Sequence, residues 1–160
     1  MGSAIRFEVK ADSATFHGAP YRNVTGVLAV RLADTWFPEH NWNDFPVIVL
    51  SWWMGEAAHV SNGEEGDFAF MDGPFGFRAR GDEGGVRVLL EDRHSDPPRV
   101  MAEGVVSLDA FRGAITSAAA ATVAACDEHG WPSCDVDRLR SDITEATAQQ
   151  QVEADKARER

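Results

Sequence analysis

Apolar and polar residues alternate along several short stretches of the chain, which is the pattern of half-buried β-strands. Ile5–Lys10 alternates strictly, and Val27–Leu32 reads as a second strand of more buried character. Asp67–Met71 and Phe75–Arg80 alternate on either side of a turn at Asp72, Gly73 and Pro74. These two stretches therefore predict a β-hairpin.

Two further strands follow the hairpin. A turn at Gly81–Gly85 leads into a strand at Val86–Glu91, and Arg99–Glu103 is the last candidate strand. Short connections favour antiparallel pairing, so we expect one antiparallel sheet of about five to six strands with helices on one face. Four aromatic side chains should lie near its centre: Phe68, Phe70, Phe75 and Phe77.

Three longer stretches have helical character. Phe45–Val60 is apolar apart from polar positions at four-residue steps, and Pro46 suits a first helical turn, so we expect a mostly buried central helix. Ser107 is a good N-cap for a second helix, which Gly130 ends. A third helix begins near Asp135, and its apolar face disappears beyond Thr147.

These elements predict a single α+β domain. The chain has 160 residues and is 44% hydrophobic, which suits one core. We expect the domain to occupy residues 1–148 and the charged tail, residues 149–160, to fray or remain disordered. The longest apolar run, Phe45–Met54, is too short to span a membrane, and no signal peptide is visible, so a cytoplasmic location is expected.

The charge narrows the choice of partner. Twenty-six acidic residues against fifteen basic ones give a formal net charge of −11, which disfavours nucleic acid and membrane surfaces and favours a basic protein. No Lys or Arg occurs between Arg31 and Arg78, although this segment holds eight acids and four of the five tryptophans. Aromatic anchors among acids suit an interface. The predicted partner-binding residues are Trp36, Glu39, Trp42, Asp44, Glu64, Glu65 and Asp72.

Candidate catalytic and metal sites are weak. Cys126, His129 and Cys134 offer three soft ligands where structural zinc wants four, and the two cysteines are too few for a disulfide framework. No glycine-rich phosphate loop lies between a strand and a helix, and Ser51 lacks the glycines of a hydrolase elbow. We therefore predict neither an enzyme nor a cofactor or metal site.

Four stretches together resemble small bacterial immunity proteins, which protect cells from their own polymorphic or contact-delivered toxins. They are Trp36–Pro38, Trp42–Pro46, Leu50–Trp53 and Phe70–Phe75. Such proteins are commonly acidic, cytosolic α+β domains that occlude a basic toxin active site. The resemblance implies an antitoxin-like inhibitor of a toxin effector domain. The alternative is a small-ligand or regulatory binding domain with a tryptophan-lined pocket.

Overall fold

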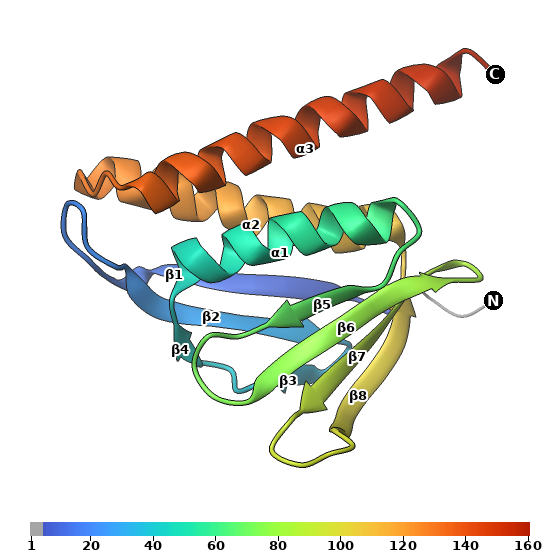
Figure 1. Ribbon diagram of the computed structural model, residues 1–160, viewed down its shortest axis with the longest axis horizontal. Helices are drawn as coiled ribbons and strands as arrows, with labels where there is room; N and C mark the ends of the chain where they lie inside the picture. Colours follow the sequence, from blue (N-terminus) through green and yellow to red (C-terminus); the bar gives the residue numbers. More distant parts are fainter. Residues whose placement is uncertain (1–4) are drawn as a thin grey trace.

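The computed structural model describes residues 5–160 and confirms the α+β class (Figure 1). It contains two four-stranded antiparallel sheets and three helices. The first sheet comprises β1 (Phe7–His17), β2 (Thr25–Leu32), β3 (Thr35–Phe37) and β4 (Asn43–Asp44). The second comprises β5 (Gly66–Ala69), β6 (Phe75–Asp82), β7 (Gly85–Asp92) and β8 (Arg99–Val106). The helices are α1 (Pro46–Ser61), α2 (Leu108–His129) and α3 (Cys134–Arg158).

The eight strands differ from the expected single sheet of about five to six. The stretch Trp36–Asp44 has the composition of a loop, yet its ends add two short strands that both pair with β2. The hairpin of β1 and β2 pairs with these short strands, while β5 to β8 form a meander of their own. Alternation within a strand reports which face is buried, but it carries no information about which strand lies alongside.

Aromatic side chains fill the core between the second sheet and the helices. Phe68 and Phe77 lie opposite each other on β5 and β6, and their rings stack with centroids 4.7 Å apart. Trp53 of α1 is fully buried, with its ring centroid 5.1 Å from those of Phe70 and Phe77. Three of the four predicted aromatics are therefore central, while Phe75 is only partly buried near the end of the sheet.

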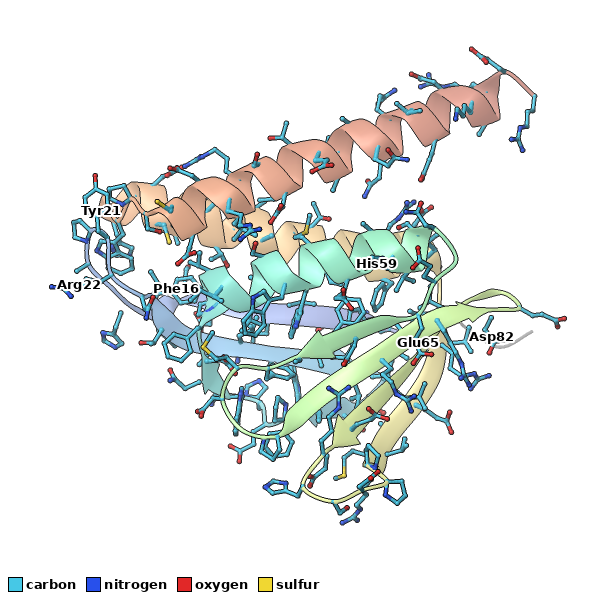
Figure 2. All side chains as sticks on the ribbon, viewed as in Figure 1. Phe16, Tyr21, Arg22, His59, Glu65 and Asp82 are labelled. Carbon is cyan, nitrogen blue, oxygen red and sulfur yellow. The ribbon has the colours of Figure 1, made fainter. Side chains whose placement is uncertain are left out.

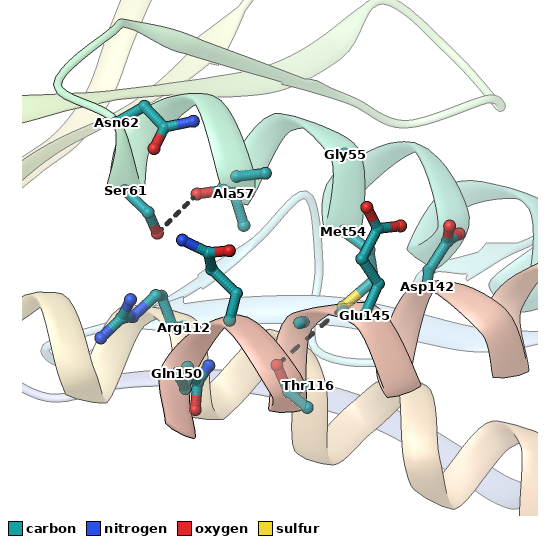
Figure 3. Close-up of a pocket in the computed structure, with 13 residues that line it drawn as sticks. Met54, Gly55, Ala57, Ser61, Asn62, Arg112, Thr116, Asp142, Glu145 and Gln150 are labelled. Carbon is teal, nitrogen blue, oxygen red and sulfur yellow. Dashed lines mark hydrogen bonds between the residues drawn. The ribbon is translucent and has the colours of Figure 1, made fainter. Parts of the chain in front are cut away.

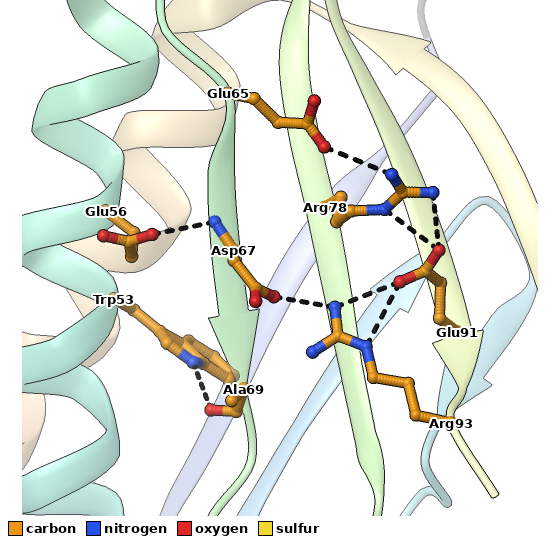
Figure 4. Close-up of polar contacts among 8 residues, drawn as sticks. All are labelled: Trp53, Glu56, Glu65, Asp67, Ala69, Arg78, Glu91 and Arg93. Atoms are coloured by element: carbon orange, nitrogen blue, oxygen red, sulfur yellow. Dashed lines mark hydrogen bonds and ion pairs between the residues drawn. The ribbon is translucent and has the colours of Figure 1, made fainter. Parts of the chain in front are cut away.

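Helix α1 also covers the edge of the second sheet. The backbone N–H of Asp67 donates to Glu56 Oε1 at 2.9 Å, and Trp53 Nε1 donates to the carbonyl oxygen of Ala69 at 2.9 Å (Figure 4). An exposed edge strand would offer such backbone groups to another chain. Side chains of α1 therefore satisfy part of the edge of β5. The neighbouring Trp52 points away from the core and is 46% exposed.

Helices α2 and α3 begin as the sequence predicts. Ser107 Oγ accepts a hydrogen bond from Ala110 N at 3.0 Å, and Gly130 adopts φ 71°, the left-handed conformation that commonly ends a helix. Their connection also fixes the β1–β2 loop, because Tyr21 N donates to the Pro132 carbonyl oxygen at 2.8 Å. The Tyr21 side chain itself is exposed at the tip of that loop (Figure 2).

Residues 149–160 do not form the frayed tail expected from the sequence. Helix α3 continues to Arg158, and its last turns extend past α1 and α2 (Figure 1). An ion pair of 2.9 Å between Glu153 Oε2 and Arg112 Nη1 of α2 ties this part to the domain. Polar pairs one turn apart, such as Gln151 with Asp155 at 3.0 Å, support the exposed helix. The apolar pattern alone could not report these polar contacts.

Candidate binding surface

Asp44 lies at a buried junction between two loops. Its side chain has no exposed surface, and its two oxygens accept hydrogen bonds from Trp42 Nε1 at 3.0 Å and Phe45 N at 2.8 Å. They also accept from Met71 N at 3.3 Å and Asp72 N at 3.1 Å. Asp44 therefore holds the segment before α1 against the β5–β6 loop. This corrects the prediction that Asp44 contacts a partner, because its carboxylate is inaccessible.

Three loops meet around this junction and form one surface, here called the three-loop face (residues 38–43, 71–75 and 92–101). The ring of Phe75 lies edge-on to Trp42 at 5.2 Å and to His94 at 5.4 Å. The backbone N–H of Arg93 donates to the Pro74 carbonyl oxygen at 2.7 Å. Segments far apart in the sequence are therefore locked side by side by aromatic and backbone contacts.

The three-loop face exposes apolar side chains. Met71 is 38% exposed, and Val100 and Met101 are 44% and 47% exposed. A bulge in β8 leaves Met101 without a partner on β7, since Glu91 pairs with Val100 and Leu90 with Ala102. Bulges redirect side chains in this way and are frequent beside functional sites. The face thus combines polar loops with accessible apolar contacts.

Acidic side chains on the three-loop face remain available. Glu39 and Asp72 are exposed, and neither forms an ion pair with any side chain of residues 5–160. Asp92 is instead hydrogen-bonded to the side chain and backbone N–H of His94, and these bonds lower the pKa of its carboxyl. Asp92 is therefore ionised at neutral pH, and the face carries negative charge.

Trp36 lies on the outer side of the first sheet, where two cations approach its ring. Lys10 Nζ and Arg31 Cζ each lie 5.7 Å from the ring centroid. Lys10 also donates to Asn41 Oδ1 at 3.1 Å, which links this cluster to the three-loop face. Although the segment between Arg31 and Arg78 contains no Lys or Arg, the fold places Lys10 and Arg31 against Trp36. The sequence-based picture of a uniformly acidic region is therefore wrong in space.

Glu64 and Glu65 lie at the other end of β5 from Asp72. Glu65 Oε1 is 3.3 Å from Arg78 Nη1, and Glu64 Oε2 is 3.5 Å from His59 Nδ1. Figure 2 shows Glu65 and His59 on the same side of the molecule. The seven predicted partner residues thus fall into two groups. The structure brings together Glu39, Trp42, Asp44 and Asp72, with Trp36 beside them, and separates Glu64 and Glu65.

A second buried carboxylate, Glu91, lies on the uncovered face of the second sheet and was not anticipated. It is 2% exposed, and its oxygens lie 2.8 Å from Arg78 Nη2 and 3.0 Å from Arg93 Nη2 (Figure 4). The hydrogen bond to Glu91 raises the pKa of Arg78, and Arg93 also reaches Asp67 at 2.7 Å. Arg78 and Arg93 are therefore both occupied by acids. Nothing in the local sequence distinguishes Glu91 from a solvated strand residue.

A groove of about 370 Å³ lies between the three helices (Figure 3). Its walls come from α1 and α3, and α2 contributes Arg112 and Thr116. No tryptophan is among the residues that line it, so it does not correspond to the tryptophan-lined pocket of the alternative prediction. The groove and the three-loop face are separate features, since they share no residue.

Among the residues that the structure describes, the side chains considered as metal ligands in the sequence do not form a metal site. Cys126 is buried, Cys134 is exposed, and the ring of His129 stacks on Trp131 at 4.2 Å. Within residues 5–160, no group of three or more His, Cys, Asp or Glu side chains is arranged to hold a metal ion. None of the helices in this range is long and apolar enough to cross a membrane.

Comparison with known proteins found no relative of this chain. No protein-family model matches the chain, no curated protein sequence matches it, and no solved structure matches its fold.

Proposed function

We propose that this protein binds a basic protein partner through the three-loop face and neutralises it, as an immunity protein neutralises a toxin domain. The observation that carries the proposal is the Asp44 junction. Four hydrogen bonds to a buried carboxylate fix two loops whose exposed side chains include Glu39, Met71 and Asp72. A surface fixed before binding loses less conformational entropy when its partner docks.

The chemistry of the face suits a basic active site. Glu39 and Asp72 form no ion pair among residues 5–160, so both can attract a cation from a partner. The net charge of −11 adds long-range attraction, which raises association rates. Met71 and the partly buried Trp42 provide apolar contact at the centre of the face. In this proposal acidic side chains occupy the positions of a toxin's anionic substrate.

The two groups of predicted residues have different roles in this proposal. Glu39, Trp42 and Asp72 belong to the contact, whereas Asp44 supports it from below. Trp36 borders the contact, with cations already against its ring. Glu64 and Glu65 lie at the other end of β5 from Asp72, so in this proposal they contribute long-range attraction and not direct contact.

Binding kinetics with the protein encoded by the adjacent gene test this proposal. Asp72→Lys should lower the association rate constant about tenfold at low salt, and the difference from wild type should shrink at high salt as the field is screened. Glu83→Lys is a matched control, because Glu83 is an exposed acid in the turn at the opposite end of the β6–β7 hairpin. Equal rates for Asp72→Lys and Glu83→Lys would contradict the proposed face.

A second variant distinguishes direct contact with the partner from long-range electrostatic attraction. Met71→Ala should leave association unchanged and raise the dissociation rate constant about tenfold, because it removes an exposed apolar contact. Thermal unfolding of the unbound variant should match that of wild type. If the complex forms but the partner keeps its enzymatic activity, the proposed neutralising role is wrong even though the binding is real.

A further inference from the structure

The interhelical groove has a floor of small and apolar side chains. Met54 and Ala57 of α1 are 6% and 7% exposed, and Ala146 of α3 contributes from the opposite wall. Thr116 Oγ1 of α2 contacts Met54 Sδ at 4.0 Å beneath them (Figure 3). An elongated apolar group lying along this floor would be shielded from water on several sides.

Gly55 leaves the groove open on the α1 side. A Cβ added there would meet no atom of the described residues within 4 Å, although glycine inside a helix costs about 1 kcal/mol relative to alanine. Packing against α3 therefore does not require glycine at this position. A larger side chain would project into the groove without disturbing the helices, which makes Gly55 a suitable position to block it.

The charged groups of the groove favour a cation. Asp142 and Glu145 of α3 line one end, and neither forms an ion pair with a base among residues 5–160. Asp142 Oδ2 accepts a hydrogen bond from Ser51 Oγ at 2.7 Å, which orients the carboxylate toward α1. Arg112 also lines the groove, but Asp109 and Glu153 bind its two terminal nitrogens at 3.0 and 2.9 Å. The unbalanced charge in the groove is therefore negative.

We propose that this groove binds a small organic cation, an ammonium or guanidinium group carried on an alkyl stem. The cationic head lies between Asp142 and Glu145, and the stem lies over Met54, Ala57 and Ala146. The volume of about 370 Å³ is at the lower end of the range for small-molecule sites. This site is independent of the three-loop face, so either proposal can fail without the other.

Calorimetric titration with three six-carbon probes tests the ligand class. At neutral pH, hexylammonium should bind at least tenfold more tightly than hexanol, and hexanoate should show no binding. Shortening hexylammonium to butylammonium should weaken binding roughly fourfold for each methylene removed from the apolar floor. Absence of hexylammonium binding, or equal affinity for hexanol or hexanoate, would overturn the proposal.

A matched pair of glycine variants tests the location. Gly55→Leu fills the groove and should reduce hexylammonium affinity at least tenfold. Gly113→Leu makes the same change on α2, at a position that is equally open and does not line the groove, and it should leave affinity within twofold of wild type. If both variants bind like wild type, or both lose affinity equally, the ligand does not occupy this groove.

A second pair tests the head-group contact. Glu145→Gln should weaken hexylammonium binding at least fivefold, because it removes one of the two carboxylates at the cationic end. Glu128→Gln, at an exposed position near the end of α2, gives the same change in net charge away from the groove and should have less than a twofold effect. Equal weakening by both would show non-specific attraction to an acidic protein and overturn the assigned head-group site.

Discussion

Two buried carboxylates, Asp44 and Glu91, are stabilised in opposite ways. Asp44 is fully buried and is surrounded by three backbone N–H groups and the indole N–H of Trp42. Glu91 is 2% exposed and lies between the guanidinium groups of Arg78 and Arg93. Among residues 5–160 no base forms an ion pair with Asp44, whereas two arginines pair with Glu91.

The two carboxylates differ because the residues around each one supply different hydrogen-bond donors. No Lys or Arg occurs between Arg31 and Arg78, and Asp44 is hydrogen-bonded by the loops of that same segment. Glu91 instead lies on a sheet face where Arg78 comes from the neighbouring strand β6 and Arg93 follows just after the end of β7. A buried carboxylate needs donors, and either backbone amides or guanidinium groups can provide them. Backbone donors leave the surrounding surface negative, while arginines neutralise it.

Removal of the Asp44 carboxylate should have the largest effect on stability. Asp44→Ala leaves three backbone N–H groups and one indole N–H without their acceptor, so we expect a loss of about 4 kcal/mol in the free energy of unfolding. Urea denaturation measures it. Asp72→Ala, at an exposed position in the β5–β6 loop that Asp44 holds, should change stability by less than about 0.5 kcal/mol. A loss below about 1 kcal/mol for Asp44→Ala would show that water replaces the carboxylate easily.

Removal of the Glu91 charge should reduce the free energy of unfolding by less than removal of the Asp44 carboxylate. Arg78 and Arg93 are 41% and 23% exposed, and each keeps a second acid, Glu65 and Asp67 respectively. We therefore expect Glu91→Gln to destabilise the protein by about 2 kcal/mol in the same denaturation experiment, below the usual cost of breaking a fully buried pair. The control is Glu103→Gln, which loses only a 3.4 Å contact of a half-exposed side chain and should cost under about 0.5 kcal/mol. An effect of Glu91→Gln larger than that of Asp44→Ala would reverse the comparison.

The position of Arg93 depends on Gly76. A Cβ at Gly76 would lie 2.6 Å from Arg93 Nη1 and 2.9 Å from the Phe68 carbonyl oxygen, so Gly76→Ala should displace the guanidinium from Glu91. We expect a loss of about 1 kcal/mol by thermal or urea unfolding, and a smaller loss in the Glu91→Gln background because the two sites are coupled. Gly81→Ala on the same strand meets no described atom within 4 Å and is the control. Additive losses would show that Gly76 acts independently of the Glu91 network.

The smallest expected effect is a pH dependence at the three-loop face. Hydrogen bonds from His94 lower the pKa of Asp92 in the folded protein, so its stabilising contribution is fully present above the unfolded-state pKa of about 4. That contribution is lost as the pH falls through the folded-state pKa. Asp92→Asn should therefore reduce the fall in the urea midpoint between about pH 5 and pH 2. Asp96→Asn, at an exposed position in the β7–β8 loop, should leave that fall in the urea midpoint unchanged.

Much of the secondary structure could be predicted because its signals are local. Pro46 at the start of α1, Ser107 at the start of α2 and Gly130 at its end all act through their own backbone neighbourhoods. The alternation around Phe68 and Phe77 likewise reports which side of one hairpin is buried. The candidate interface was predicted less well, because Asp44, chosen for its charge and position beside Trp42, proved to be a buried hydrogen-bond acceptor.

The α+β class, the bounds of α1 and α2, the start of α3 and the excess of negative charge all follow from the sequence alone. Three features emerged only from the three-dimensional fold: the two separate sheets, the continuation of α3 to Arg158 beyond its ion pair with Arg112, and the burial of Glu91 between arginines. The fold also brings bases to the segment between Arg31 and Arg78 from other strands and loops, since Lys10 approaches Trp36, Arg78 pairs with Glu65 and Arg93 pairs with Asp67. The physical reason is that periodicity and capping act over a few residues, whereas strand pairing, ion pairs and burial of a carboxylate depend on residues far apart in the chain.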